Sequence, residues 1–204
     1  MFARTVTISQ ADPSTIDNGI AYVRDVVMPE LTLLGCLGMS LVVDRRSGQV
    51  ITTSSWETRD ALDRTRAAMA PYRAEAAELM AGDLTIADWE VAMMHRDHDA
   101  FDLAACRITW ARTPDVDGVL EWFRAATLPS ISEAMGFCSV SVFVDRQRGA
   151  VCVTTTFDSR ATLEDSRARA HANRLRMAEF VEVEFTDVRE FDLALARLRL
   201  PELV

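Results

Sequence analysis

Histidine and arginine side chains are the main candidates for chemistry in this sequence. His171 could act as a general base near neutral pH, because imidazole has an ordinary pKa of about 6.5. Arg107 could hold a carboxylate or an enolate with its planar fork of donors, and Arg4 occupies the matching place in the first half. Together these groups suit proton abstraction from an acidic organic molecule. The alternatives are a surface histidine, and arginines at an exposed edge or in salt bridges with Glu90 or Asp192.

Two aromatic residues mark a candidate ligand pocket. Trp56 and Phe157 end the second strand of each predicted hairpin, where sheet and helices diverge and could accept a flat apolar ligand. Ser54 and Thr155 lie two residues earlier and could orient a ligand oxygen. The alternatives are core aromatics and ordinary strand hydroxyls. With Arg4, these four residues form the predicted ligand pocket.

A group of metal-binding residue types falls between the two halves. His95 and His98 lie near Asp97, Asp99 and Asp102, but we expect this stretch to be a solvated linker without fixed geometry. The four cysteines have no Cys-x-x-Cys spacing, so we expect reduced thiols and neither a disulfide framework nor a zinc site. We therefore predict no metal site.

The elements that must position these residues come from an internal repeat. Residues 43–67 align without a gap on residues 144–168, with ten identities in 25 positions. Matched pairs include Asp44 with Asp145 and Arg66 with Arg167. The match continues outward, so each half has the same parts in the same order.

Each half is predicted to have the order βαββαβ. First strands over 3–9 and 106–111 are followed by helix starts at Asp12-Pro13 and Thr113-Pro114, and Pro29 and Pro129 should kink or end those helices. The remaining elements are hairpins over 38–55 and 139–156, helices toward Met80 and Met177 with caps at Thr58 and Ser159, and last strands over 89–94 and 191–195.

This order predicts an α+β fold of two tandem ferredoxin-like units. Each sheet would have one face free of helices, so we expect the two units to pack sheet to sheet as an intramolecular dimeric α+β barrel. The predicted domains are residues 1–96 and 105–204, joined by a linker over 97–104.

Charge and hydropathy narrow the class of partner. The net charge of −9 and the lack of a basic stripe argue against nucleic acid. The apolar runs are too short to cross a bilayer, which argues against a membrane, and the first residues lack the pattern of a secretory signal. We therefore expect a cytoplasmic protein whose partner is a small apolar or aromatic molecule.

The segments Thr53–Leu62 and Thr154–Leu163 carry a family resemblance. In each, a strand ends in an aromatic residue and a helix with an acidic cap follows. This pattern resembles the dimeric α+β barrel superfamily, and within it the antibiotic-biosynthesis-monooxygenase-like domains. Each half corresponds to one family domain, so the resemblance covers nearly the whole chain. Single-domain members are usually homodimers, so here we expect a monomer that is an internal pseudo-dimer, or a homodimer formed through helices.

The resemblance implies two known chemistries. One is oxygenation of a quinol-like or polyketide-like aromatic without a cofactor, and the other is heme binding and degradation. Heme-degrading members carry an iron-binding histidine about nine residues after the aromatic, where this chain has Thr65 and Ser166. Neither hydroxyl replaces imidazole as an iron ligand, so we expect no heme and no other cofactor.

The functional hypotheses remain two. The first is a small-molecule-binding protein that acts as a cofactor-independent monooxygenase, with His171 and Arg107 as its catalytic candidates. The alternative is a non-catalytic ligand-binding or stress-associated module of the same fold, because fold alone does not decide activity.

Overall fold

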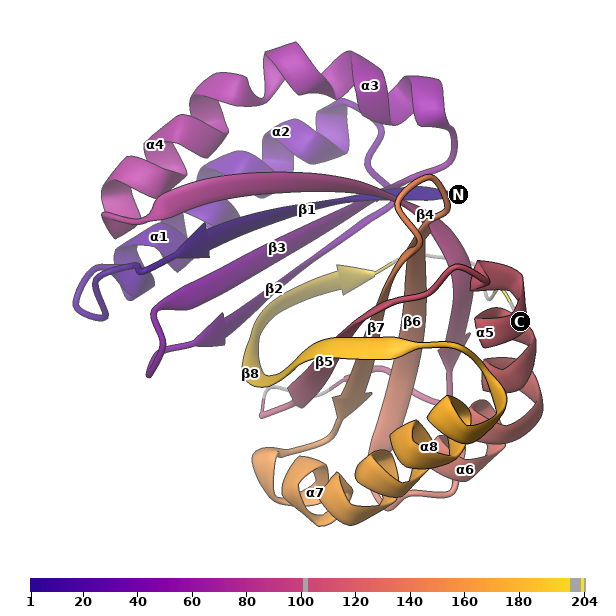
Figure 1. Cartoon of the computed structure of the whole chain (residues 1–204). Helices are drawn as coiled ribbons and strands as arrows, with labels where there is room; N and C mark the ends of the chain where they lie inside the picture. Colours follow the sequence, from indigo (N-terminus) through magenta and orange to yellow (C-terminus); the bar gives the residue numbers. More distant parts are fainter. Residues whose placement is uncertain (101–102, 199–202, 204) are drawn as a thin grey trace. The chain divides into compact units, whose positions relative to one another are not determined.

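The computed structural model describes residues 1–100, 103–198 and 203, and it divides into two compact units. The first unit contains Met1–Trp89 and residues 193–198, and the second contains Glu90–Asp192 and residue 203. Each unit has its own strands and helices (Figure 1). Phe101 and Asp102 of the predicted linker lie outside the described residues.

The first unit follows the predicted order of elements. Its strands are β1 (Phe2–Ser9), β2 (Gly38–Asp44), β3 (Gln49–Trp56) and the first part of β4 (Asp83–Arg96). Its helices are α1 (Ile16–Tyr22), the π-helical turn η1 (Val23–Val27), α2 (Met28–Leu33), α3 (Arg59–Ala68) and α4 (Ala70–Met80).

The second unit repeats this order. Its strands are β5 (Ala105–Arg112), β6 (Phe137–Asp145), β7 (Ala150–Phe157) and the first part of β8 (Glu184–Leu198). Its helices are α5 (Val116–Trp122), the π-helical turn η2 (Phe123–Thr127), α6 (Leu128–Ser132), α7 (Arg160–Asp165) and α8 (Arg167–Phe180). The prediction of two tandem ferredoxin-like units is therefore confirmed.

The eight strands run antiparallel to their neighbours, and the two units order their strands in corresponding ways. The order is β4-β1-β3-β2-β8 in the first unit and β8-β5-β7-β6-β4 in the second. Strands β4 and β8 appear in both orders, because each begins in one unit and ends in the other: β4 passes from Trp89 to Glu90, and β8 from Asp192 to Leu193. Both strands are longer than the sequence pattern predicts. The predicted domain boundaries at 1–96 and 105–204 stay a prediction.

Each unit buries one helix-covered sheet face (Figure 1). In the first, Ile16 and Leu62 from helices join Leu41 and Trp56 from strands in one apolar cluster. The second cluster also joins helix and strand residues and includes Phe157, whose ring meets Phe137 edge-on at 6.3 Å between centroids. Burial of these faces is the main driving force for forming the elements.

Helix starts follow the predicted chemistry in the second helix of each unit. The Thr58 hydroxyl accepts a hydrogen bond from the Ala61 amide, and Ser159 forms a capping box with Thr162. The first helices start later than predicted. Asp12 accepts from the Ser14 amide and so shapes a turn before α1, which begins at Ile16.

Proline does not end the first helix of either unit. Pro29 and Pro129 lie in the first turns of α2 and α6, directly after the π-helical turns η1 and η2. A π turn re-spaces the backbone hydrogen bonds, so the helical path continues past a residue that lacks an N–H donor. Within the described residues, no helix is both long and apolar enough to span a membrane.

Candidate ligand-binding site

A cavity lies between the helices and the sheet of the second unit. The empty space along it is about 800 Å³, a figure that includes open solvent at its mouth. Most of its wall is apolar, from Val119, Phe123, Val142, Met177 and Phe185 among others.

Strand and helix periodicity explain why these residues face one space. Residues 107, 109 and 111 of β5 line the cavity, as do 151, 153, 155 and 157 of β7, because alternate residues of a strand share a face. The helical wall uses positions spaced by three or four residues, including 119, 123 and 127, then 166, 170, 173 and 177. Sheet and helices thus each contribute one continuous side.

Arg107 lines this cavity with its charge already paired. Its guanidinium donates to Glu190 Oε1 at 2.8 Å, to Ser166 Oγ at 2.9 Å and to the Leu163 carbonyl at 2.9 Å. Burial would raise the pKa of Glu190, but hydrogen bonds from Arg167 and Arg107 outweigh that effect and lower the pKa to about 2. Arg107 is therefore a neutralised, fixed part of the wall.

A second arginine, Arg174, lines the same cavity without a counter-charge. Within the described part of the chain it forms no ion pair, and burial together with nearby Arg107 lowers its pKa. Guanidinium stays charged at all ordinary pH values, so the lowered pKa means that the cation is held in an unfavourable place. An anionic ligand group would relieve this cost.

Two polar atoms of the same cavity wall have no hydrogen-bond partner among the described residues. They are Thr127 Oγ1 and Asn173 Nδ2, and both atoms are buried. Each such atom costs about 1–3 kcal/mol unless something bonds to it. None of the described residues that line the cavity is Asp, Glu or His. The site therefore combines a mostly apolar wall with hydrogen-bond donors and a positive charge that has no described counter-charge.

The first unit has a smaller version of this cavity, about 520 Å³ with its mouth. Arg4 repeats the role of Arg107: it donates to Asp88 at 2.6 Å and to Thr65 Oγ1 at 3.2 Å. Met69 and Tyr72 occupy the places that Ala170 and Asn173 hold in the second unit. These larger side chains reduce the space, so the second unit is the better candidate.

The predicted site residues are distributed over both cavities and beyond them. Arg107, Thr155 and Phe157 line the second cavity, and Arg4 and Ser54 line the first. Trp56 is fully buried in the first core, where its Nε1 donates to Ser54 Oγ at 3.3 Å.

His171 lies outside the cavity, as in the surface alternative, and the arginine partners differ from those expected. His171 is exposed on α8 and is not among the described residues that line the second cavity. Both strand arginines form salt bridges, but with Asp88 and Glu190 rather than the predicted Glu90 and Asp192. The register explains this correction in the second unit, because Arg107 lies directly opposite Glu190.

Sequence reasoning missed three polar residues of the cavity wall, Arg174, Thr127 and Asn173. One signal was present: Arg174 has an identical counterpart, Arg73, at the same offset of the repeat. Arg73 also lines its cavity, but it donates to the Arg66 carbonyl. No sequence signal marks Thr127 and Asn173, because their lack of partners is a property of packing.

The place of the iron-binding histidine is taken by buried hydroxyls. Thr65 and Ser166 each accept a hydrogen bond from the strand arginine and donate to a backbone carbonyl, of Leu62 and Leu163 respectively. These hydroxyls are committed to structure, and neither is a good iron ligand. A matched structure is nevertheless a heme-degrading enzyme, LmHde from Listeria monocytogenes, with 10% identity, coverage of 94% of this chain and 99% of that one, and a TM-score of 0.56.

Other solved structures share the fold. A candidate monooxygenase from Lactobacillus acidophilus matches with a TM-score of 0.70 and 9% identity over 97% of this chain and 96% of that one. An anthrone oxidase-like protein matches with a TM-score of 0.61 and 13% identity over 97% and 93%. A ferredoxin-fold protein related to antibiotic biosynthesis monooxygenases, from Listeria monocytogenes, matches with a TM-score of 0.52 and 11% identity over 94% of each chain. These likenesses confirm the predicted antibiotic-biosynthesis-monooxygenase-like fold.

Sequence comparison gives closer relatives. No family model matches the chain. The uncharacterized protein Rv2557 of Mycobacterium tuberculosis is 44% identical over 207 residues, which cover 100% of this chain and 92% of that protein. Uncharacterized protein Rv2558 of the same organism is 44% identical over 210 residues, which cover 100% and 88%. The chain therefore belongs to the same family as Rv2557 and Rv2558 of Mycobacterium tuberculosis.

Proposed function

We propose that the second unit binds a small aromatic or polyketide-like molecule that carries an anionic or strongly accepting oxygen. The observation that carries this proposal is that Arg174, which forms no ion pair with the described residues, lines the same mostly apolar cavity as the unpartnered Asn173 Nδ2 and Thr127 Oγ1. The apolar wall supplies contact area for the body of the ligand. The three polar groups supply the orientation, because charge-assisted hydrogen bonds in a dry site are the strong ones.

Arg174→Gln tests this proposal through a named probe, 1-hydroxy-2-naphthoate. Loss of the charge-assisted hydrogen bond should weaken binding by about 10- to 100-fold, as expected for about 1.5–3 kcal/mol. Isothermal titration calorimetry on the full chain measures the effect.

Arg176→Gln is the matched control, because Arg176 lies exposed on the same helix and should leave the affinity unchanged. An uncharged probe of similar shape, 2-acetylnaphthalene, should bind more weakly than the naphthoate and respond little to Arg174→Gln. Equal affinity of the naphthoate for wild type and Arg174→Gln would contradict the proposal.

The second candidate function is oxygenation of the bound molecule without a cofactor. Two fold neighbours support it, the candidate monooxygenase and the anthrone oxidase-like protein. With anthrone, the balanced reaction consumes one dioxygen and gives anthraquinone and water. The substrate itself supplies the electrons, so the protein need only bind its enolate and exclude water.

Proton removal sets this candidate apart from simple binding. Since no described cavity-lining residue is Asp, Glu or His, the substrate would have to enter as an anion that Arg174 stabilises. Oxygen uptake with anthrone, measured against the uncatalysed rate, distinguishes the two functions. Uptake above that rate supports oxygenation, and binding without uptake supports a non-catalytic module.

A further inference from the structure

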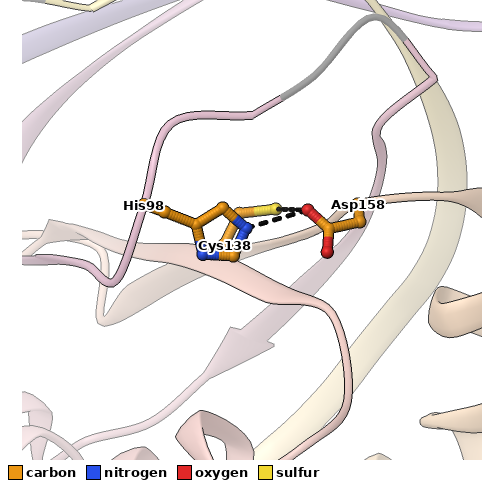
Figure 2. A group of neighbouring side chains, drawn as sticks. All are labelled: His98, Cys138 and Asp158. Carbon is orange, nitrogen blue, oxygen red and sulfur yellow. Dashed lines mark hydrogen bonds and ion pairs between the residues drawn. The ribbon is translucent and has the colours of Figure 1, made fainter.

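Three side chains from distant parts of the sequence meet at one place in the second unit. His98 follows the end of β4, Cys138 lies at the start of β6 and Asp158 follows the end of β7. Their ligand atoms all lie within 4.8 Å of one another. Figure 2 shows the three side chains converging, with one Asp158 oxygen in contact with both the imidazole and the thiol.

The backbone fixes all three positions. The amides of Asp97 and His98 both donate to the Cys138 carbonyl, at 2.8 and 3.4 Å. The Asp158 amide donates to the Gly136 carbonyl at 2.8 Å. His98 therefore does not lie on an unconstrained connection, as the sequence suggested, but is attached to the start of β6.

The contacts inside this cluster have the lengths of hydrogen bonds. His98 Nε2 lies 2.8 Å from Asp158 Oδ1, and Cys138 Sγ lies 3.2 Å from the same oxygen. Around a tetrahedral zinc ion the corresponding separations would be ~3.3 and ~3.6 Å, from the usual bond lengths. These two separations are therefore shorter than those around a zinc ion by roughly half an ångström.

The imidazole also has the outer partner that metal-binding histidines use. Asp97 Oδ2 lies 3.0 Å from His98 Nδ1, on the side of the ring away from Asp158. A carboxylate at this nitrogen fixes the ring orientation and leaves Nε2 directed at the cluster. The His98 and Asp158 side chains are about one-third exposed, at 34% and 35%, so an ion could enter from solvent.

We propose that His98, Cys138 and Asp158 bind a divalent transition-metal ion of the zinc class, with a water molecule in the fourth position. One sulfur, one nitrogen and one oxygen donor form a mixed set that suits a borderline-soft ion and does not suit calcium or magnesium. Three protein ligands with one open position are typical of an accessible zinc site.

Binding of the ion requires the thiolate form of Cys138, so the thiol proton leaves to solvent as the metal binds. The bound cation then compensates the charge of the buried thiolate.

Cobalt(II) titration of the full chain tests the site directly. We expect one equivalent to bind and to give a thiolate-to-cobalt charge-transfer band in the near ultraviolet, which zinc then removes by displacement. His98→Gln, Cys138→Ser and Asp158→Asn should each weaken the affinity at least tenfold and abolish or shift that band.

The repeat offers matched controls. Leu37 and Glu57 occupy the places of Cys138 and Asp158 in the first unit, so Glu57→Gln should leave cobalt binding unchanged. Cys36→Ser tests whether another thiol contributes, and it should also have no effect. His98→Gln, which alters a partly exposed side chain, decides the case if Cys138→Ser fails to fold. Absence of the band in folded wild type, or a band that survives His98→Gln and Asp158→Asn, would overturn the proposal.

Discussion

Glu190→Leu should lower the free energy of unfolding by about 3–5 kcal/mol, because it leaves a buried arginine without its carboxylate. The Arg107 side chain is only 6% exposed and its guanidinium cannot lose its proton. The hydrogen bonds to Ser166 Oγ and the Leu163 carbonyl remain, but they carry no compensating charge. Urea unfolding followed by circular dichroism measures the loss.

The double variant Arg107→Met/Glu190→Leu gives the decisive comparison. Removing both charges should restore much of the stability, because a buried ion pair contributes little beyond an apolar pair of similar size. Glu184→Leu on the same strand is the control, since Glu184 is exposed and its replacement should change stability by less than about 0.5 kcal/mol. A double variant no more stable than Glu190→Leu would show that the charge argument is wrong.

Acid should remove the contribution of Glu190 to stability. Folding lowers the pKa of Glu190 from 4.5 to about 2, despite the opposing effect of burial, because Arg167 and Arg107 stabilise the carboxylate. Each pKa unit corresponds to about 1.4 kcal/mol, so this group contributes about 3–4 kcal/mol. A lowered pKa in the folded protein gives stability that is present above pH 4.5 and is lost as the pH falls toward 2.

Urea unfolding of wild type and Glu190→Gln at several pH values between 7 and 2 isolates this contribution. The difference in stability between the two proteins should be largest above pH 4.5 and should shrink as the pH falls toward 2. A difference that stays constant over this range would mean that Glu190 is not the titrating group.

The repeat explains why the fold could be predicted well. The gapless match of 43–67 with 144–168 carries the hairpin and the helix cap of both units, and local chemistry fixes both features. The lengths of β4 and β8 could not be predicted, because each strand begins in one unit and continues into the other. The helix path past Pro29 was also hidden, since a π turn has no local sequence signature.

The candidate site was only partly predictable. Strand alternation correctly places Arg107, Thr155 and Phe157 on one cavity wall. It cannot show that Arg107 is paired while Arg174 is not, because that depends on which carboxylate lies opposite in the sheet. Trp56 is a core residue, and its burial reflects close packing rather than a sequence pattern.

The two units share a buried ion pair between a strand arginine and a carboxylate, but the helix residues near this pair differ. Arg4 with Asp88 in the first unit corresponds to Arg107 with Glu190 in the second. The surrounding helix differs, and small Ala170 leaves space where Met69 fills it. Duplication thus allows one unit to keep a smaller cavity while the other provides a larger one.

Ligand binding by Ala170→Met tests the central claim, that the second unit's cavity is a binding site for an apolar anion. This substitution copies Met69 of the first unit into the cavity wall, while Ala168→Met adds the same side chain at an exposed place on α8. Calorimetric titration with 1-hydroxy-2-naphthoate should show no saturable binding to Ala170→Met and unchanged binding to Ala168→Met. Wild-type affinity in a folded Ala170→Met protein would contradict the account.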